Sequence, residues 1–254
     1  VVDEVIKQGR ASLVGVDAPL TQRVTQLAAT LGIPMLVGAP MAQGMAALTN
    51  SAVLVDAHGV IGQRYDKRHL VPFGEFIPLE RMWPWVRQHL PPIGDFVSGQ
   101  VPTVFRGPAG QQQVPPFSVL ICFEDLFPQL ARACVRAGAR WLVVITNDAW
   151  FGPTSAAYQH AQASTFRAVE LRVPVVRAAN TGWSGCIDAS GRWGARVRDV
   201  SGQELFVTGT QTCDLPLGSA TSLYQWWGDG FALLCLLLTG GWLLKHAARH
   251  RAPA

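Results

Sequence analysis

The chain has 254 residues, of which 49% are hydrophobic and 15% are charged, and its formal net charge is +4. This length accommodates one large domain with a sizeable core. The basic residues form no recognisable nucleic-acid-binding module, which excludes that class of partner. The mean hydropathy of +0.19 is high for a soluble protein, and the apolar excess is concentrated near the C-terminus.

Predicted helices and strands alternate along the chain. Apolar residues at helical spacing predict a helix at 20–31, and a turn at 57–59 predicts a hairpin between strands at 51–56 and 60–65. This alternation, with apolar strands, predicts a layered α/β domain. Further strands are predicted at 33–39, 116–122, 141–146, 174–178, 184–188, 195–199 and 205–208, and further helices at 126–137 and 155–172.

Two apolar segments differ from this pattern. Residues 79–96 carry large apolar side chains between prolines, and they form either a surface helix packed on the core or an amphipathic lid that contacts lipid or an acyl chain. Residues 224–244 contain Asp229 as their only charged residue, and as a helix they would span about 31 Å, close to the thickness of a bilayer core. Aromatic residues near both ends and a basic cluster after the run predict a transmembrane helix with a cytoplasmic C-terminus. A buried C-terminal helix is the alternative.

If the C-terminus is cytoplasmic, the domain that precedes the predicted transmembrane helix lies on the opposite side of the membrane. In a bacterium that side is the periplasm. The chain starts without a signal peptide, so we expect sequence upstream of it. Its five cysteines show neither a CxxC pair nor metal-like spacing with histidine. We therefore expect no disulfide framework and no metal site.

Cys122 lies where a predicted strand ends and a predicted helix begins. N–H groups at a helix start activate a thiol and hold an oxyanion, although most cysteines in such places are inert core residues. Lys67 follows a predicted strand on a loop held by prolines and a glycine. It either stabilises an oxyanion formed at Cys122 or is an ordinary solvated charge. Glu75 and Glu124 lie near these residues in sequence, and either can orient the lysine, serve as a base or cap a helix.

The chain carries three motifs in order: YDKRHLVPFGEFIP at 65–78, SVLICFEDLFP at 118–128 and TNDAWFG at 146–152. Together with QHAQASTFRAVELRVPVVRAANTGWSG at 159–185, they resemble the carbon–nitrogen hydrolase (nitrilase) superfamily, and within it most closely the apolipoprotein N-acyltransferase family. The resemblance implies an α-β-β-α sandwich followed by one transmembrane helix. The expected division is a catalytic domain at 1–222, a transmembrane helix at 223–245 and a basic cytoplasmic tail at 246–254.

The superfamily uses a Glu–Lys–Cys triad, and its cysteine and lysine fall on Cys122 and Lys67. The triad glutamate follows a strand near the start of the domain, where Glu4 is the only candidate. Asp3 precedes Glu4 in place of the family's proline. The base is therefore either Glu4 or a glutamate upstream of this sequence.

The resemblance also implies the surroundings of the triad. The second glutamates of the lysine and cysteine motifs fall on Glu75 and Glu124. A backbone N–H near Phe123 is expected beside the oxyanion. The loop with Asn147 and Asp148 is expected beside the site, where an Asx turn is an equally good local interpretation.

Aromatic side chains are candidates for keeping water from the site, foremost Trp150 and the tryptophans at 83–85, with Trp183 a weaker one. We interpret His69 and His160 as structural residues rather than catalytic ones.

The implied reaction is a ping-pong acyl transfer without a cofactor. Cys122 takes an acyl chain from a phospholipid as a thioester and passes it to the N-terminal amine of a diacylglyceryl-cysteine apolipoprotein. The implied location is the bacterial inner membrane, with the catalytic domain in the periplasm. Two alternatives remain open: a membrane-anchored amidase that hydrolyses small C–N bonds, and a non-catalytic nitrilase-like domain that binds lipid or a partner protein.

Overall fold

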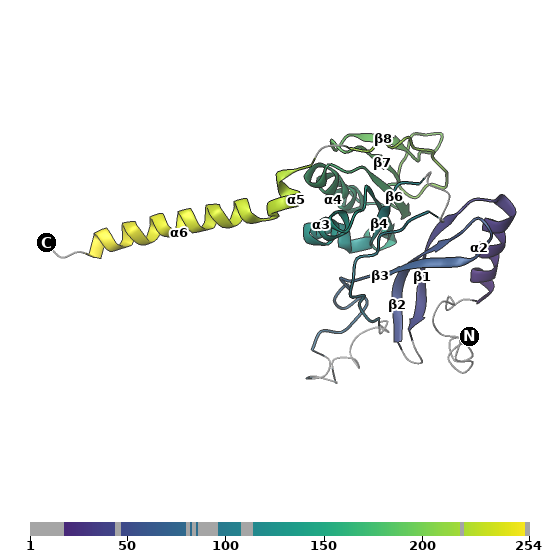
Figure 1. Ribbon diagram of the computed structural model, residues 1–254, viewed down its shortest axis with the longest axis horizontal. Helices are drawn as coiled ribbons and strands as arrows, with labels where there is room; N and C mark the ends of the chain where they lie inside the picture. Colours follow the sequence, from purple (N-terminus) through teal and green to yellow (C-terminus); the bar gives the residue numbers. More distant parts are fainter. Residues whose placement is uncertain are drawn as a thin grey trace.

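The computed structural model describes residues 18–43, 47–79, 82, 85, 96–107, 114–218 and 221–251. Two β-sheets pack face to face, and helices cover both outer faces (Figure 1). The first sheet is antiparallel, in the order β1 (Met35–Gln43), β2 (Ala47–Val55) and β3 (Ile61–Asp66). This arrangement confirms the predicted layered α/β fold.

The second sheet has five strands, and its central part is parallel. β4, β5 and β6 run in the same direction, and β7 and β8 are added antiparallel at one edge. Their bounds are β4 (Phe117–Ile121), β5 (Trp141–Asn147), β6 (Val175–Asn180), β7 (Gly185–Ile187) and β8 (Trp193–Arg196).

β4 contributes side chains to the cores on both faces of its sheet, and all five of its residues are buried. Alternate side chains of a strand point to opposite faces. Phe117, Val119 and Ile121 pack against Ala52 and Tyr65 of the first sheet. Leu120 packs on the other face, with the helices α3 (Pro128–Arg136) and α4 (Ala156–Leu171). Continuous apolar runs of this kind are typical of parallel strands covered on both faces.

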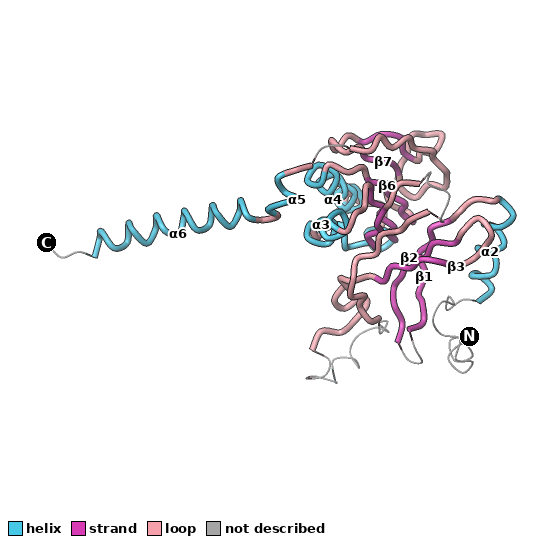
Figure 2. Tube along the Cα trace, viewed as in Figure 1, coloured by secondary structure: helices cyan, strands magenta, loops and turns pink. Residues whose placement is uncertain are grey.

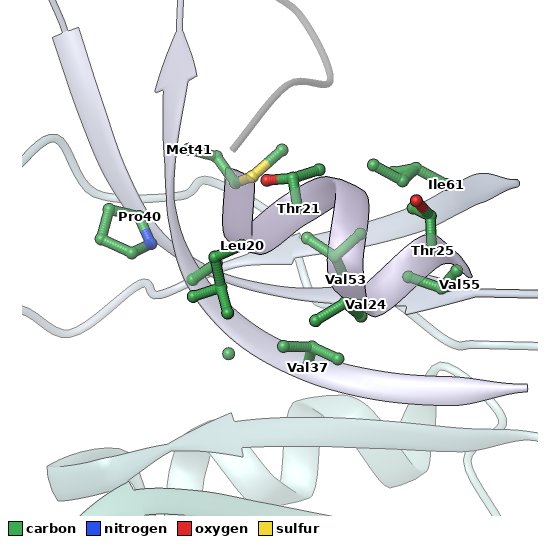
Figure 3. A pocket seen from close by; sticks show the side chains of 12 residues that line it. Leu20, Thr21, Val24, Thr25, Val37, Pro40, Met41, Val53, Val55 and Ile61 are labelled. Carbon is green, nitrogen blue, oxygen red and sulfur yellow. The ribbon is translucent and has the colours of Figure 1, made fainter. Parts of the chain in front are cut away.

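The helix α2 (Ala18–Leu31) covers the outer face of the first sheet. An apolar cavity of about 120 Å³ lies between this helix and β1, β2 and β3 (Figure 3). Val37 and Val53 point into this cavity, whereas their neighbours Leu36 and Ala52 face the second sheet. The cavity is therefore separated from the interior between the sheets by the first sheet itself.

Most predicted elements are confirmed within a few residues, including the hairpin β2–β3. The Asp56 carboxylate fixes that hairpin turn by accepting hydrogen bonds from the N–H groups of His58 and Val60. The strand predicted at 205–208 is wrong. Phe206 has a φ of 57°, which is incompatible with a regular strand, and its N–H donates to Thr181 O. Figure 2 distinguishes the helices and strands from the loops that connect them.

The C-terminal apolar run forms two helices where one was predicted. α5 (Leu223–Trp227) ends at Gly228, whose φ of 55° stops the first helix, and α6 (Gly230–Arg251) follows. The Arg132 guanidinium of α3 donates hydrogen bonds to the carbonyls of Gln225 and Trp226, which attaches α5 to the domain. α6 extends away from the domain (Figure 1). Within the described part of the chain, no helix combines the length and the hydropathy that crossing a membrane requires.

One disulfide corrects the sequence-based expectation. Cys186 of β7 is bonded to Cys213, 27 positions further along the chain. Cys122, Cys134 and Cys235 are free thiols. The pair was missed because the two cysteines become neighbours only when the irregular segment after β8 folds back along β7, and disulfide connectivity cannot be deduced from spacing alone.

Replacing Cys186 and Cys213 together with serine should lower the free energy of unfolding by about 3 kcal/mol, since the cross-link restricts a long loop in the unfolded chain. Urea denaturation followed by tryptophan fluorescence measures this difference. Cys235→Ser, which changes an exposed thiol on α6, is the control and should leave stability unchanged. Equal stability of the double variant and the control would refute a structural role for the disulfide.

Candidate active site

The candidate residues gather where strands of both sheets end. Cys122 directly follows β4, Asn147 ends β5 and Asn180 ends β6, so the carboxyl ends of three parallel strands lie side by side. Lys67 directly follows β3 of the first sheet. Open α/β sheets characteristically bind ligands at such carboxyl edges. Glu4 and most of the segment 79–96 lie outside the described residues.

The backbone of Cys122 is left-handed, with φ = 53°. A residue with a side chain is strained in this region by about 1–2 kcal/mol, and such strain persists only where the surroundings fix it. Cys122 starts the short 3₁₀-helix η2 (Cys122–Leu126). Its thiol is free and half-buried. Because the chain turns sharply at Cys122, its thiol is partly exposed although every residue of the preceding strand β4 is buried.

Lys67 is only 1% exposed, so it is not the ordinary solvated charge that its sequence neighbours suggested. Its ammonium donates a hydrogen bond to Glu75 Oε2 at 2.8 Å. Glu75 also accepts from Asn50 Nδ2 at 2.7 Å and from the Val71 N–H at 2.8 Å. Glu75 therefore holds the buried lysine in place, which is one of the alternatives that the sequence left open for this glutamate.

Glu124 joins the loop after β3 to the turn that carries Cys122. Its carboxylate accepts hydrogen bonds from the Tyr65 hydroxyl and from the N–H groups of Arg68, His69 and Ile121. Burial raises the pKa of the Glu124 carboxyl, and these donors oppose that rise. Since every partner donates and none accepts, the ionised carboxylate fits the site. The loop of Lys67 and the Cys122 turn are thus attached to one buried anion.

A second buried group lies on the other side of η2 and contains two acids and two bases. Asp125 Oδ2 accepts from Arg177 Nη1 at 2.8 Å and from Ser164 Oγ at 2.7 Å. Asp148 Oδ2 accepts from Arg177 Nη2 at 3.2 Å. The His160 ring lies between the two acids, with Nε2 at 3.0 Å from Asp125 Oδ1 and Nδ1 at 2.9 Å from Asp148 Oδ1. We call these four ionisable residues the ionic cluster.

The charge of the ionic cluster decides the protonation of His160. Two carboxylates and one guanidinium leave a net charge of −1 in a buried place, and a protonated imidazole restores neutrality. Burial lowers the pKa of His160, but the carboxylates of Asp125 and Asp148 outweigh burial and raise it to about 9. Nδ1 also lies 2.9 Å from Arg177 Nη2, and an imidazolium N–H can donate only to the carboxylate there.

The remaining predicted residues take different places. Asn147 accepts from the Ala149 N–H and starts the 3₁₀-helix η3 (Asp148–Phe151), which supports the Asx-turn interpretation. Phe123 stacks near His69, and that contact also joins η2 to the Lys67 loop. Trp150 is 85% exposed and is not packed over Cys122. No group of potential metal ligands occurs among the residues that the structure describes.

Sequence reasoning missed Asp125 and Arg177 and assigned His160 only a general structural role. Trp183, considered there as a shield, is a core residue packed against Trp193. A signal for the cluster did exist. Asp125 and its neighbour Glu124 stand between apolar residues, and Arg177 interrupts a buried strand, where an unpaired charge is costly.

Glu124→Gln should lower the free energy of unfolding by about 2–3 kcal/mol, because the amide N–H₂ then faces a buried donor. Chemical denaturation of the two proteins measures the loss. Glu204→Gln is a matched control, since its partners Arg196 and Arg198 are partly exposed, and it should cost under about 1 kcal/mol. Similar losses in both variants would contradict the role assigned to Glu124.

The raised pKa of His160 predicts a pH dependence of stability. A group whose pKa is higher in the folded than in the unfolded state contributes its full stabilisation below the unfolded value, near 6.5. That contribution is lost as the pH rises towards about 9. The free energy of unfolding should therefore fall between these pH values, and His160→Gln should flatten this part of the curve. A parallel decline in both proteins would exclude His160 as its source.

Comparisons with known proteins agree with this geometry. Residues 3–225 match the carbon–nitrogen hydrolase family. The chain is 44% identical over 187 residues to an apolipoprotein N-acyltransferase of Geobacter metallireducens, a match that covers 74% of this chain and 34% of the relative. It is 38% identical over 211 residues to the enzyme of that name from Methylococcus capsulatus, covering 82% of this chain and 39% of the relative. The chain thus spans between a third and two fifths of the length of these relatives.

Solved structures give the same fold at lower sequence similarity. An amidase from Nesterenkonia sp. AN1 superposes with a TM-score of 0.53 at 22% identity, over 78% of this chain and 70% of the amidase. That structure contains acrylamide added to the amidase's active-site cysteine. Both the sequence match over most of the chain and the shared fold lead to one conclusion: this chain belongs to the carbon–nitrogen hydrolase family.

Proposed function

We propose that this chain is the catalytic region of an N-acyltransferase that moves an acyl chain from a phospholipid to the N-terminal amine of a diacylglyceryl-cysteine apolipoprotein. One observation carries the proposal. Lys67 is buried and paired with Glu75, Cys122 is strained and half-buried, and the backbone next to each of them donates hydrogen bonds to the same carboxylate, Glu124. The relatives named apolipoprotein N-acyltransferase support the choice of reaction.

In the first half-reaction, a base takes the proton of the Cys122 thiol, and the thiolate attacks the ester carbonyl of a phospholipid. The new C–S bond leaves a negative charge on the carbonyl oxygen. The Lys67 ammonium and a backbone N–H near Phe123 stabilise this oxyanion. The ester C–O bond then breaks, and the lysophospholipid leaves with the proton that the base returns. We assign the base role to Glu4.

In the second half-reaction, the apolipoprotein amine attacks the thioester. A C–N bond forms, the C–S bond breaks, and the base accepts the proton of the amine. Water must be kept from the thioester, or the acyl chain is lost by hydrolysis. Asn147 and Asp148 shape the turn next to the site, and Trp150, the shielding candidate on the same loop, is exposed and would need lipid or substrate beside it to exclude water.

We also propose the membrane location that this substrate requires, with residues 1–222 as the periplasmic catalytic domain, 223–245 as the membrane anchor and 246–254 as a cytoplasmic tail. α6 supports the anchor, because its leucines are exposed all around the helix. The Cys186–Cys213 disulfide supports the compartment, because disulfides persist in oxidising surroundings such as the periplasm.

The acyl-enzyme is the direct test of this proposal. The full-length protein is incubated with vesicles of phosphatidylethanolamine and phosphatidylglycerol, and peptides containing Cys122 are analysed by mass spectrometry. We expect an acyl thioester on Cys122 and none in Cys122→Ala. Lys67→Met should slow its formation by about 10²–10³, the usual loss of one oxyanion-stabilising group, and Glu4→Gln should slow it as well.

Two controls separate the alternatives. Cys235→Ser changes a thiol outside the site and should be acylated as the unmodified protein is. Addition of a small aliphatic amide tests the amidase alternative, since an amidase would release ammonia from it. If Cys122 stays unmodified and ammonia is released, the chain is an amidase. If neither the thioester nor ammonia is detected, the domain is non-catalytic.

A further inference from the structure

The turn that carries Cys122 is held from two opposite directions by consecutive side chains. Glu124 points towards the first sheet and binds the loop after β3. Asp125 points the other way and binds Arg177 of β6 and Ser164 of α4. Both carboxylates are completely buried. A left-handed Cys122 is therefore fixed by two separate anchors.

The second anchor extends beyond η2. Arg177 donates with one nitrogen to Asp125 and with the other to Asp148, the first residue of η3. His160 spans the same two carboxylates with its two ring nitrogens. The cluster thus links the turn after β4 to the turn after β5. Both links are made by cationic side chains, His160 of α4 and Arg177 of β6. Gly182 closes the cluster, since a Cβ there would lie 2.1 Å from Asp148 Oδ2.

The charges around His160 balance. Asp125 and Asp148 approach from η2 and η3, and Arg177 approaches from β6. On its own helix, Arg167 is paired with Glu170 at 2.8 Å. Neutralising the histidine would leave one uncompensated negative charge in this buried place. His160 thus lies within ion-pair distance of both carboxylates, and its positive charge balances the cluster.

We propose that the ionic cluster, with His160 as its central tie, is the positioning device that keeps the Cys122 thiol in its reactive orientation by coupling η2 to η3. His160 is a positioning residue, because it acts through Asp125 and touches no reacting atom. The proposal rests on the nucleophilic role proposed above for Cys122. It predicts that damage to the cluster changes the rate at which Cys122 reacts and leaves lipid binding unchanged.

Two measurements on the full-length protein test this proposal at a temperature well below the melting point of each variant. The first is the rate of Cys122 alkylation by iodoacetamide, which needs no acyltransferase activity. The second is the rate of thioester formation as a function of phospholipid concentration. His58→Gln, the same replacement on an exposed turn, is the matched control.

We expect His160→Gln to lower the maximal rate of thioester formation at least tenfold and the alkylation rate severalfold, with an unchanged half-saturating phospholipid concentration. His160→Gln combined with Asp148→Asn restores a neutral cluster in which an amide can bridge the two turns, and it should recover much of both rates. A cluster that served only stability would show a lower melting temperature and normal rates.

The outcomes distinguish this proposal from the one on which it rests. If the unmodified protein forms no thioester, the acyltransferase proposal fails, and the alkylation rates still judge the cluster. If His160→Gln folds and both rates stay within twofold of His58→Gln, the positioning role is wrong. If His160→Gln does not fold, Ser164→Ala decides. That variant removes one hydrogen bond to Asp125 without changing the charge, and unchanged rates in it would equally overturn the proposal.

Discussion

The hydrogen bonds that converge on the Glu124 carboxylate are the interaction on which the site depends. The two sheets are held together elsewhere by apolar side chains, which set a separation but no exact alignment. Glu124 adds the missing alignment, because it binds N–H groups of the Lys67 loop and of the Cys122 turn at the same time. A buried carboxylate with fewer hydrogen-bond donors would lower the free energy of unfolding. Glu124 therefore stabilises the fold only when all of its hydrogen bonds form.

Apolar and charged side chains occupy different parts of the protein interior. The space between the sheets and the space beneath α3 and α4 are filled almost entirely by hydrocarbon. Among the described residues, most buried charged groups lie near the strand ends, where Lys67 pairs with Glu75 and where the ionic cluster lies; Arg167 of α4 is an exception. Replacing such pairs with apolar groups would often be neutral or stabilising in a protein core. Their presence at one edge therefore indicates a functional demand on geometry.

Much of this arrangement was predictable from the sequence, and the limits have physical causes. The order of helices and strands followed from periodicity, because local patterns determine local structure. Cys122, Lys67, Glu75 and Glu124 followed from motifs. Contacts between distant segments did not follow: Cys186 meets Cys213, and Arg177 meets Asp125, only after the chain has folded. The helix break at Gly228 was missed because residues 224–244 were treated as one continuous helix, although Gly228, Asp229 and Gly230 interrupt the apolar residues and Gly228 has a positive φ.

The placement of the thiols has a consequence for survival in an oxidising compartment. A nucleophilic cysteine there risks capture by any neighbouring thiol. Cys186 and Cys213 are already joined to each other, Cys134 is buried on α3 in the core on the other face of β4, and Cys235 is exposed on α6. The other two free thiols, Cys134 and Cys235, therefore lie on helices away from the turn that carries Cys122. In the oxidising compartment proposed above, wrong cysteine pairs form most readily while the chain is unfolded, so the order of folding and oxidation would decide how much of the protein keeps a usable Cys122 thiol.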